Sequence, residues 1–204
     1  MKFITFEGPE GSGKSSQSRW LARRLARAGY GVVCLKDPGS TALGRSARQL
    51  LLHTRASLSP LAEALLFVGA RVQLVEERIR PALRRGQVVI CDRFHDATVA
   101  YQGFGGGLDV AWLDRVGRSA VDGVMPRLTI LLDVPTEQGF ARLRHAPDRM
   151  ERKAGAFHRR VRAGYRRLAR RHPRRFIIVD ATRPPAEVRQ RIEAIVLRRL
   201  KRHH

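Results

Sequence analysis

The sequence of 204 residues predicts an α/β fold of three layers, in which a five-stranded, mostly parallel sheet has helices on both faces. Five short apolar segments alternate with longer segments whose apolar residues recur at helical spacing. The apolar segments are continuous rather than alternating, which is typical of parallel strands covered on both sides. We find no repeat and no long linker, so residues 1–204 are predicted to form a single domain.

The five predicted strands are short, and most end beside residues that break regular structure. Val88, Val89 and Ile90 illustrate the pattern, because this apolar run follows Gly86 and stops at a charged pair, Asp92-Arg93. The predicted strands cover residues 2–6, 32–36, 87–91, 128–134 and 176–180.

Helices are predicted between these strands from apolar spacing and from capping residues. The longest pattern runs over residues 61–84, where Pro81 is expected to kink the helix or to start a short second piece. Glycines at 105–107 are expected to interrupt the helix that starts near Ala97, and Thr136 is expected to cap the helix over 137–144. The other predicted helices cover residues 17–28, 43–53, 110–121 and 157–171, and a last one begins at Pro185.

A glycine-rich segment connects the first predicted strand to the first predicted helix. It has the pattern Gly-x4-Gly-Lys-Ser, in the strand-to-helix context that a phosphate-binding loop needs. Its glycines allow backbone N–H groups to turn towards a polyphosphate at a helix N-terminus. Lys14 could reach the β- and γ-phosphates, and the Ser15 hydroxyl could bind Mg²⁺. The alternative is a plain glycine-rich turn. The predicted ATP-binding residues are Gly8, Pro9, Glu10, Gly11, Ser12, Gly13, Lys14 and Ser15.

The chain is strongly basic, with 40 Lys and Arg against 18 Asp and Glu and a net charge of +22. Residues 140–204 contain 21 basic and 5 acidic residues, so most of the excess lies in the last third. The charge fits either nucleic-acid binding or a nucleotide-binding lid with solvated helix faces. No zinc spacing or helix-turn-helix pattern accompanies it, which favours the second interpretation. Only weak, non-specific binding to nucleic acid is expected.

The sequence predicts a cytoplasmic protein that does not bind membranes. No apolar segment approaches the roughly 18 residues of a membrane helix, and the start of the chain does not fit a signal peptide. Cys34 and Cys91 share no metal or redox spacing and are expected to be buried thiols. Whether His203 and His204 are native residues stays open.

Several further motifs, taken in order with the glycine-rich segment, resemble those of the thymidylate kinase family, a P-loop NTPase group of nucleoside monophosphate kinases. They are Asp37-Pro38-Gly39-Ser40-Thr41, Leu66-Phe67 followed by Arg71, Asp92-Arg93-Phe94 followed by Ala100-Tyr101-Gln102-Gly103, and Asp148-Arg149. The resemblance covers nearly the whole chain. It implies transfer of the γ-phosphoryl of ATP to dTMP with Mg²⁺, giving dTDP for dTTP biosynthesis, by a homodimer.

The expected chemistry needs positioning and charge neutralisation more than a general base. The attacking group would be a phosphate monoester whose second pKa is about 6, so it is largely ionised at neutral pH. By resemblance, Asp92 lies near Mg²⁺ and the phosphates with Ser15, and Arg93 binds the acceptor phosphate. Glu10 lies near the acceptor sugar. A helix cap, a surface ion pair and a solvated loop charge are the respective alternatives.

The resemblance also implies an acceptor-binding set. Phe67 would stack on thymine, and Arg71, four residues later, would donate to the base O4. Such a donor disfavours cytosine, whose exocyclic amine is itself a donor. Tyr101 would crowd the 2′ position of the sugar, although Phe67 and Tyr101 could also be core residues. Further predicted substrate-binding residues are Lys36, Asp37, Ala97, Thr98 and Gln102.

A basic segment over about residues 142–155 is expected to form a short lid. Arg149 is the predicted catalytic residue of this lid, beside Lys14 and Arg93 in the site. Its basic neighbours are Arg144, Arg152 and Lys153. Gly11 occupies a position where one family subtype has Arg, so the lid is expected to supply catalytic cations. A solvated charge run is the alternative.

Two rival functions stay open. The first is a kinase for another pyrimidine nucleotide or for a deoxynucleoside, since Lys36-Asp37 replaces a frequent Arg-Glu and Ala97 replaces a frequent hydroxyl residue. The second is a basic nucleic-acid-binding protein with a vestigial P-loop, which the charge of +22 suggests.

Overall fold

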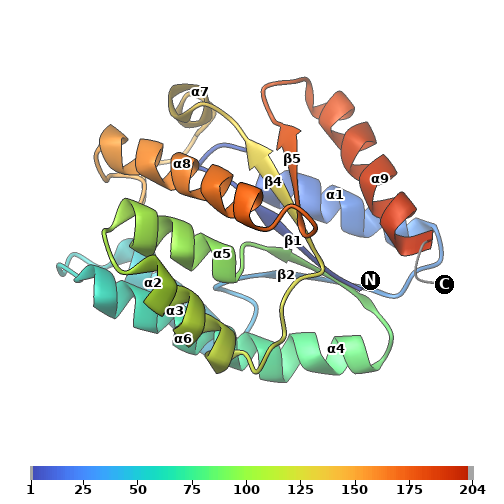
Figure 1. Ribbon diagram of the computed structural model, residues 1–204, viewed down its shortest axis with the longest axis horizontal. Helices are drawn as coiled ribbons and strands as arrows, with labels where there is room; N and C mark the ends of the chain where they lie inside the picture. The colour runs from blue at the N-terminus through green and yellow to red at the C-terminus, as the bar shows by residue number, and fades with distance from the viewer. Residues whose placement is uncertain (1, 202–204) are drawn as a thin grey trace.

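The computed structural model describes residues 2–201; His203 and His204 lie outside this range. Its five strands form one sheet in the order β2-β3-β1-β4-β5, and all neighbouring strands are parallel (Figure 1). The predicted α/β fold with a five-stranded sheet is confirmed. The strands are β1 Phe3–Glu7, β2 Val32–Lys36, β3 Val88–Asp92, β4 Leu128–Asp133 and β5 Phe176–Asp180.

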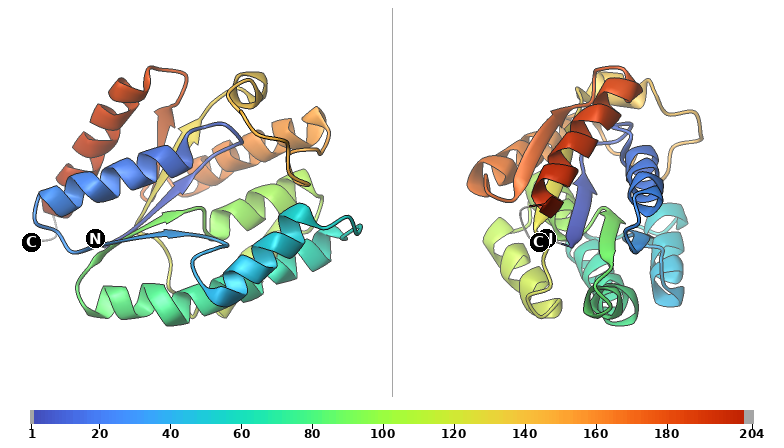
Figure 2. Two further views of the ribbon diagram at one scale, coloured as in Figure 1. Left: turned by 180° about the vertical axis from the view of Figure 1, so that it is seen from behind. Right: turned by 90° about the vertical axis from the view of Figure 1, so that its right-hand side faces the viewer.

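Helices cover both faces of the sheet, so the molecule has three layers (Figure 2). The helices before β4 are α1 Lys14–Arg27, α2 Ala42–His53, α3 Pro60–Leu74, η1 Val75–Ile79, α4 Arg80–Arg84, α5 His95–Thr98, η2 Val99–Gly105 and α6 Val110–Ala120. Those after β4 are α7 Thr136–Phe140, α8 Gly155–Arg171 and α9 Pro185–Lys201.

Each face of the sheet has its own apolar core. Leu21 of α1 and Ile192 of α9 pack with Ile4 of β1 on one face, and all three side chains are fully buried. On the other face, α8 packs along η2 and contacts β4 and β5. Burial of these faces is the main force that holds the helices to the sheet, and it fixes the loops at the carboxyl ends of the strands.

The long helical pattern over 61–84 is divided into shorter pieces. A short second piece that starts near Pro81 was one of the two outcomes that the sequence predicted. Pro81 lies at the start of the short helix α4, and the π-helical turn η1 precedes it. Pro81 has no N–H to donate within the helix, so a change in the hydrogen-bond pattern at this point has a direct cause.

Four details of the sequence prediction are wrong. The predicted helix over 137–144 ends at Phe140, and Thr136 does not cap it, because its buried hydroxyl has no hydrogen-bond partner within residues 2–201. The helical turns of η2 continue through Gly105 instead of stopping before it. Cys34 is exposed, since β2 is an edge strand; only Cys91 is buried.

Within residues 2–201, we find no helix that is both long and apolar enough to cross a membrane.

Candidate functional site

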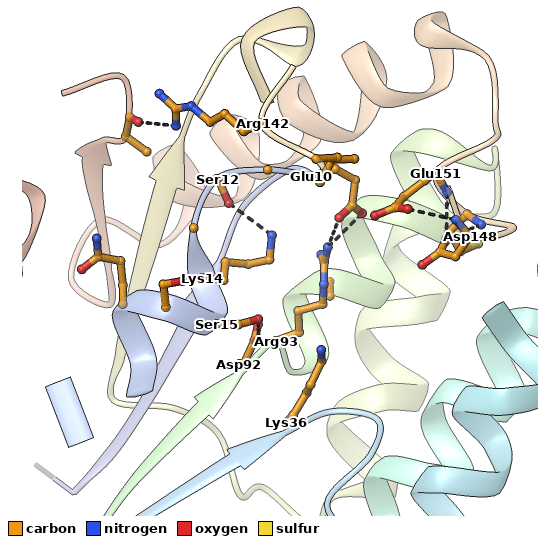
Figure 3. Close-up of a pocket in the computed structure, with 18 of the residues that line it drawn as sticks. Glu10, Ser12, Lys14, Ser15, Lys36, Asp92, Arg93, Arg142, Asp148 and Glu151 are labelled. Atoms are coloured by element: carbon orange, nitrogen blue, oxygen red, sulfur yellow. Dashed lines mark hydrogen bonds and ion pairs between the residues drawn. The ribbon is translucent and has the colours of Figure 1, made fainter. Parts of the chain in front are cut away.

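A cavity of about 1160 Å³ opens at the carboxyl edge of the sheet. Its walls come from the loops after β1, β2, β3 and β5, from α3 and η2, and from the segment that precedes α8. This is the edge where ligands bind in open α/β sheets. Figure 3 shows Lys14, Lys36 and Arg93 extending into the cavity from three different elements.

The loop over residues 8–15 follows β1 and wraps around the N-terminus of α1. Gly8 has a φ of 145° and Gly11 a φ of 65°, which side-chain-bearing residues rarely adopt. Space is equally restrictive: a Cβ on Gly8 would lie 2.4 Å from the Leu132 carbonyl oxygen, and one on Gly11 would lie 1.8 Å from the Gly139 carbonyl oxygen. The backbone of α7 therefore touches this loop directly. Gly8 and Pro9 shape the loop, and residues 10–15 line the cavity.

Lys14, the first residue of α1, folds back across the loop. Its Nζ donates to the Pro9 carbonyl at 2.6 Å and to Ser12 Oγ at 3.2 Å. Burial, together with the positive charge of Arg93, lowers the pKa of Lys14 to about 8, although Glu10 opposes the shift. The lysine therefore sits at the positive end of a helix, where an anion is the natural counter-charge.

Ser15 and Asp92 bring two oxygen ligands together at the same point. Asp92 ends β3, which pairs with β1, and its Oδ2 accepts a hydrogen bond from the Ser15 hydroxyl. Hard divalent cations such as Mg²⁺ prefer oxygen ligands and keep few protein contacts. The chemistry of this pair therefore fits a Mg²⁺ ion carried by phosphates.

Arg93 forms the centre of a compact charged cluster. Its Nη2 donates to both carboxylate oxygens of Glu10 at 2.9 Å, and its guanidinium lies 4.8 Å from the centre of the Tyr101 ring. The Tyr101 hydroxyl donates to Glu10 Oε1 at 2.5 Å. Burial opposes ionisation of Glu10, but Arg93, Lys14 and Tyr101 outweigh it and lower its pKa to about 2.

On the wall of the cavity that α3 contributes, Arg71 is buried and held on two sides. Its Nε donates to Asp37 Oδ2 at 2.6 Å and its Nη2 to Thr98 Oγ1 at 2.9 Å, while Nη1 has no partner within the described residues. Phe67 lies one turn earlier on α3 and also lines the cavity. Lys36, Ala97, Tyr101 and Gln102 complete this wall.

Gln102 also lines this wall, and only one of its two amide atoms has a hydrogen-bond partner among the described residues. Its Nε2 donates to Glu63 Oε2 at 3.1 Å, and its Oε1 is buried without a partner among the described residues. Among the described residues, this wall thus carries an unpaired donor, Arg71 Nη1, and two unpaired acceptors, Gln102 Oε1 and the Asp37 Oδ1 beside Arg71. Buried polar atoms in native proteins are nearly always paired, so Arg71 Nη1 and Gln102 Oε1 are available to a ligand in the cavity.

Arg149 is a predicted catalytic residue that does not line the cavity. Its Nη1 donates to Glu63 Oε1 at 2.7 Å and its Nε to the Leu51 carbonyl at 2.7 Å, so it holds the segment before α8 against α2 and α3. A catalytic role for Arg149 stays a prediction that requires this segment to move. Of the other basic residues of the segment, Arg152 donates to the Pro147 carbonyl and Lys153 to Glu63.

Several cavity residues carry no sequence motif. Arg48 of α2 lines the cavity. Arg142, which donates to the Ala181 carbonyl at 2.8 Å, lines it as well (Figure 3). The turn after β5, with Ala181 and Thr182, forms the end of the cavity beside Arg142. The rule that α/β sites lie beyond the carboxyl ends of strands could have pointed to this turn.

Comparison with known proteins gives one consistent assignment. The profile of the thymidylate kinase family matches residues 6–192. Thymidylate kinases of Thermomicrobium roseum and Deinococcus radiodurans are 51% and 45% identical to the chain, covering 98% and 97% of it and 96% and 97% of the relatives. The crystal structure of thymidylate kinase from Ehrlichia chaffeensis superposes with a TM-score of 0.79 at 33% identity, covering 96% of this chain and 98% of that one. The chain belongs to the thymidylate kinase family.

Proposed function

We propose that this chain transfers the γ-phosphoryl group of ATP to dTMP, giving dTDP and ADP. Family membership supports the reaction. The observation that supports thymine as the acceptor base is a donor, Arg71 Nη1, and an acceptor, Gln102 Oε1, which have no partner among residues 2–201 and belong to residues that line the cavity with Phe67.

These two atoms match one base edge and oppose another. Thymine presents an acceptor at O4 and a donor at N3–H, so Arg71 and Gln102 can satisfy both. Cytosine presents a donor at N4 and an acceptor at N3. The N4 donor would then face the Arg71 donor, and the N3 acceptor would face the Gln102 acceptor. A site built to pair with one hydrogen-bonding pattern discriminates strongly against its reverse, because the buried groups are left unsatisfied.

The loop over residues 8–15 would hold the phosphates of ATP. Its N–H groups and Lys14 lie at the N-terminus of α1, so they would neutralise charge on the group being transferred. Arg93, which now donates to Glu10, would bind the acceptor phosphate from the opposite side. The two anions would then meet between fixed cations, and no protein base is required for the attack.

Ser15 and Asp92 would hold Mg²⁺. Bound there with ATP, the ion would neutralise negative charge that develops on the phosphates. Asp92 keeps Ser15 oriented through their hydrogen bond, so both oxygens are fixed before the ligand arrives.

We also propose a lid over about residues 142–155 and a homodimer. The segment between α7 and α8 lines the cavity through His145, Asp148 and Glu151, where closure would exclude water. The dimer is supported by exposed apolar side chains on two helices that pack together, α2 and α3: they are Leu43, Leu50, Leu61 and Leu65. The cytoplasmic location stays a prediction.

A coupled assay with dTMP, dUMP, dCMP, UMP and thymidine tests the proposal. We expect dTMP to give the highest kcat/KM, and dCMP to be poor because of the reversed edge. If thymidine or dCMP were the best acceptor, the substrate assignment would be wrong. Parallel binding to single-stranded DNA should be weak and should disappear at physiological salt, because it reflects only the net charge of +22.

A further inference from the structure

Glu63 is a buried carboxylate with three partners from different parts of the chain. It lies in the first turn of α3 and is 1% exposed. Its Oε1 accepts from Arg149 Nη1 at 2.7 Å and from Lys153 Nζ at 3.1 Å, and Lys153 Nζ also donates to Oε2 at 3.2 Å. Its Oε2 accepts from Gln102 Nε2 at 3.1 Å. One side chain therefore joins the lid segment to η2.

Glu63 also shares a helix face with the acceptor wall. Phe67 follows it by four residues and Arg71 by eight, and residues spaced by four lie above one another on an α-helix. Phe67 and Arg71 line the cavity, whereas Glu63 lies just behind that lining and contacts it through Gln102. No motif in the sequence points to Glu63.

The contact with Gln102 determines which end of its amide is available. The two ends of a glutamine amide have nearly the same size and opposite hydrogen-bonding character, so the partner decides the orientation. A carboxylate that bridges two cations accepts hydrogen bonds and donates none. Gln102 must therefore direct Nε2 towards Glu63, which leaves Oε1 as the free atom.

We propose that Glu63 is a positioning residue for acceptor specificity: by accepting from Gln102 Nε2, it keeps Gln102 Oε1 free for the N–H of a thymine-type base. Rotation of the amide would place an oxygen against the carboxylate and would present a donor to the base, the arrangement that suits cytosine. Arg149 holds the carboxylate in place through its 2.7 Å contact and Lys153 adds longer contacts, so the lid and the base wall depend on the same group. The inference rests on the proposed function.

The variant Glu63→Gln tests this role at nearly constant size. Its new amide can donate to Gln102 Oε1, so the Gln102 amide is free to rotate. We expect the ratio of kcat/KM for dTMP to that for dCMP to fall about tenfold, the usual effect of one buried hydrogen bond. Most of the change should be in KM for dTMP. A purely structural role would lower both rates together and leave the ratio unchanged, which would overturn the inference.

Lys153→Met is the matched control, because it removes one cation from the same carboxylate, while Arg149 still holds Glu63 and Gln102 can still donate to its Oε2. We expect it to keep the wild-type acceptor ratio; a fall equal to that of Glu63→Gln would contradict the inference. If Glu63→Gln does not fold, Glu63→Asp replaces it, since it keeps the charge but draws the carboxylate back from Gln102. The same fall in ratio supports the inference, and an unchanged ratio overturns it.

The wild-type protein separates this inference from the proposed function. If the wild type does not prefer dTMP to dCMP, the proposed function fails. If the wild type prefers dTMP and both Glu63 variants keep that preference, only the role of Glu63 fails.

Discussion

Asp37 and Arg71 form an ion pair from which water is excluded: Arg71 Nε donates to Asp37 Oδ2 at 2.6 Å, and their side chains are 0% and 2% exposed. Burial raises the pKa of Asp37 even though Arg71 favours its charged form. The pair joins the turn after β2 to α3, so it fixes the guanidinium that we assign to the acceptor base.

Asp37→Asn should therefore be severely destabilising. It leaves Arg71 as a buried cation without a counter-charge, which typically costs about 3–5 kcal/mol. Denaturant unfolding measures this loss. The control is Asp122→Asn, which breaks the exposed pair between Arg80 and Asp122 and should cost less than about 1 kcal/mol. Equal losses in the two variants would show that burial of the Asp37 pair is unimportant.

Lys14→Ala should remove most activity without unfolding the protein. In the described part of the chain its Nζ donates hydrogen bonds only to Pro9 and Ser12 of its own loop, and loss of one such charge-stabilising group typically costs about 10²–10³-fold in rate. Turnover of dTMP and the melting temperature should be measured together. The exposed Lys2 provides the control, since Lys2→Ala should keep both values. Near-normal turnover in Lys14→Ala would contradict the mechanism.

The affinity for ATP should fall as the pH rises above about 8, where the buried Lys14 of the free protein loses its proton. The effect of rising pH on the unfolding free energy has the opposite sign. The folded-state pKa lies below the value of 10.5 for free lysine, so the unfolded chain binds more protons between about pH 8 and 10.5, and the unfolding free energy rises over that window.

Titration of a fluorescent ATP analogue between pH 6 and 10 measures the change in affinity. Lys14→Arg is the control, because a guanidinium keeps its charge throughout this range and should remove the decline. The same decline in both proteins would assign it to another group.

Leu65→Glu should convert the proposed dimer to a monomer. Leu61 and Leu65 lie one turn apart on α3 and are 44% and 51% exposed, so a charge there would oppose burial against a second copy. Sedimentation velocity measures the mass. Ile178→Glu, at the similarly exposed Ile178 of β5, should leave the mass unchanged. A Leu65→Glu protein with the wild-type dimer mass, or a monomeric wild type, would refute this interface.

Local patterns predicted much of the fold and of the site. The sheet followed from continuous apolar segments, and the loop over 8–15 from one contiguous motif. Phe67 and Arg71 could be placed on one wall because four residues form about one helical turn. In each case the deciding interactions lie within a few residues of one another.

The remaining features depend on contacts between distant residues. Glu63 meets Gln102 across 39 positions and Arg149 across 86, and the irregular segment before α8 has no periodicity from which its direction could be read. Arg149 was therefore expected in the site, although it contacts α2 and α3. Cys34 was expected to be buried because its strand is apolar. Its strand lies at the edge of the sheet, however, and strand order depends on pairing between distant segments rather than on local sequence.

The contact between Gly11 and Gly139 limits how this enzyme could change. A Cβ on Gly139 would lie 2.3 Å from the Glu10 carbonyl oxygen, just as one on Gly11 would collide with Gly139, so neither position has room for a methyl group. Replacing Gly11 alone by arginine, the residue of one family subtype, would therefore not fit this backbone. To reach that subtype, α7 would have to withdraw first, and an intermediate sequence would lose the fit between the two backbones before it gained a new cation.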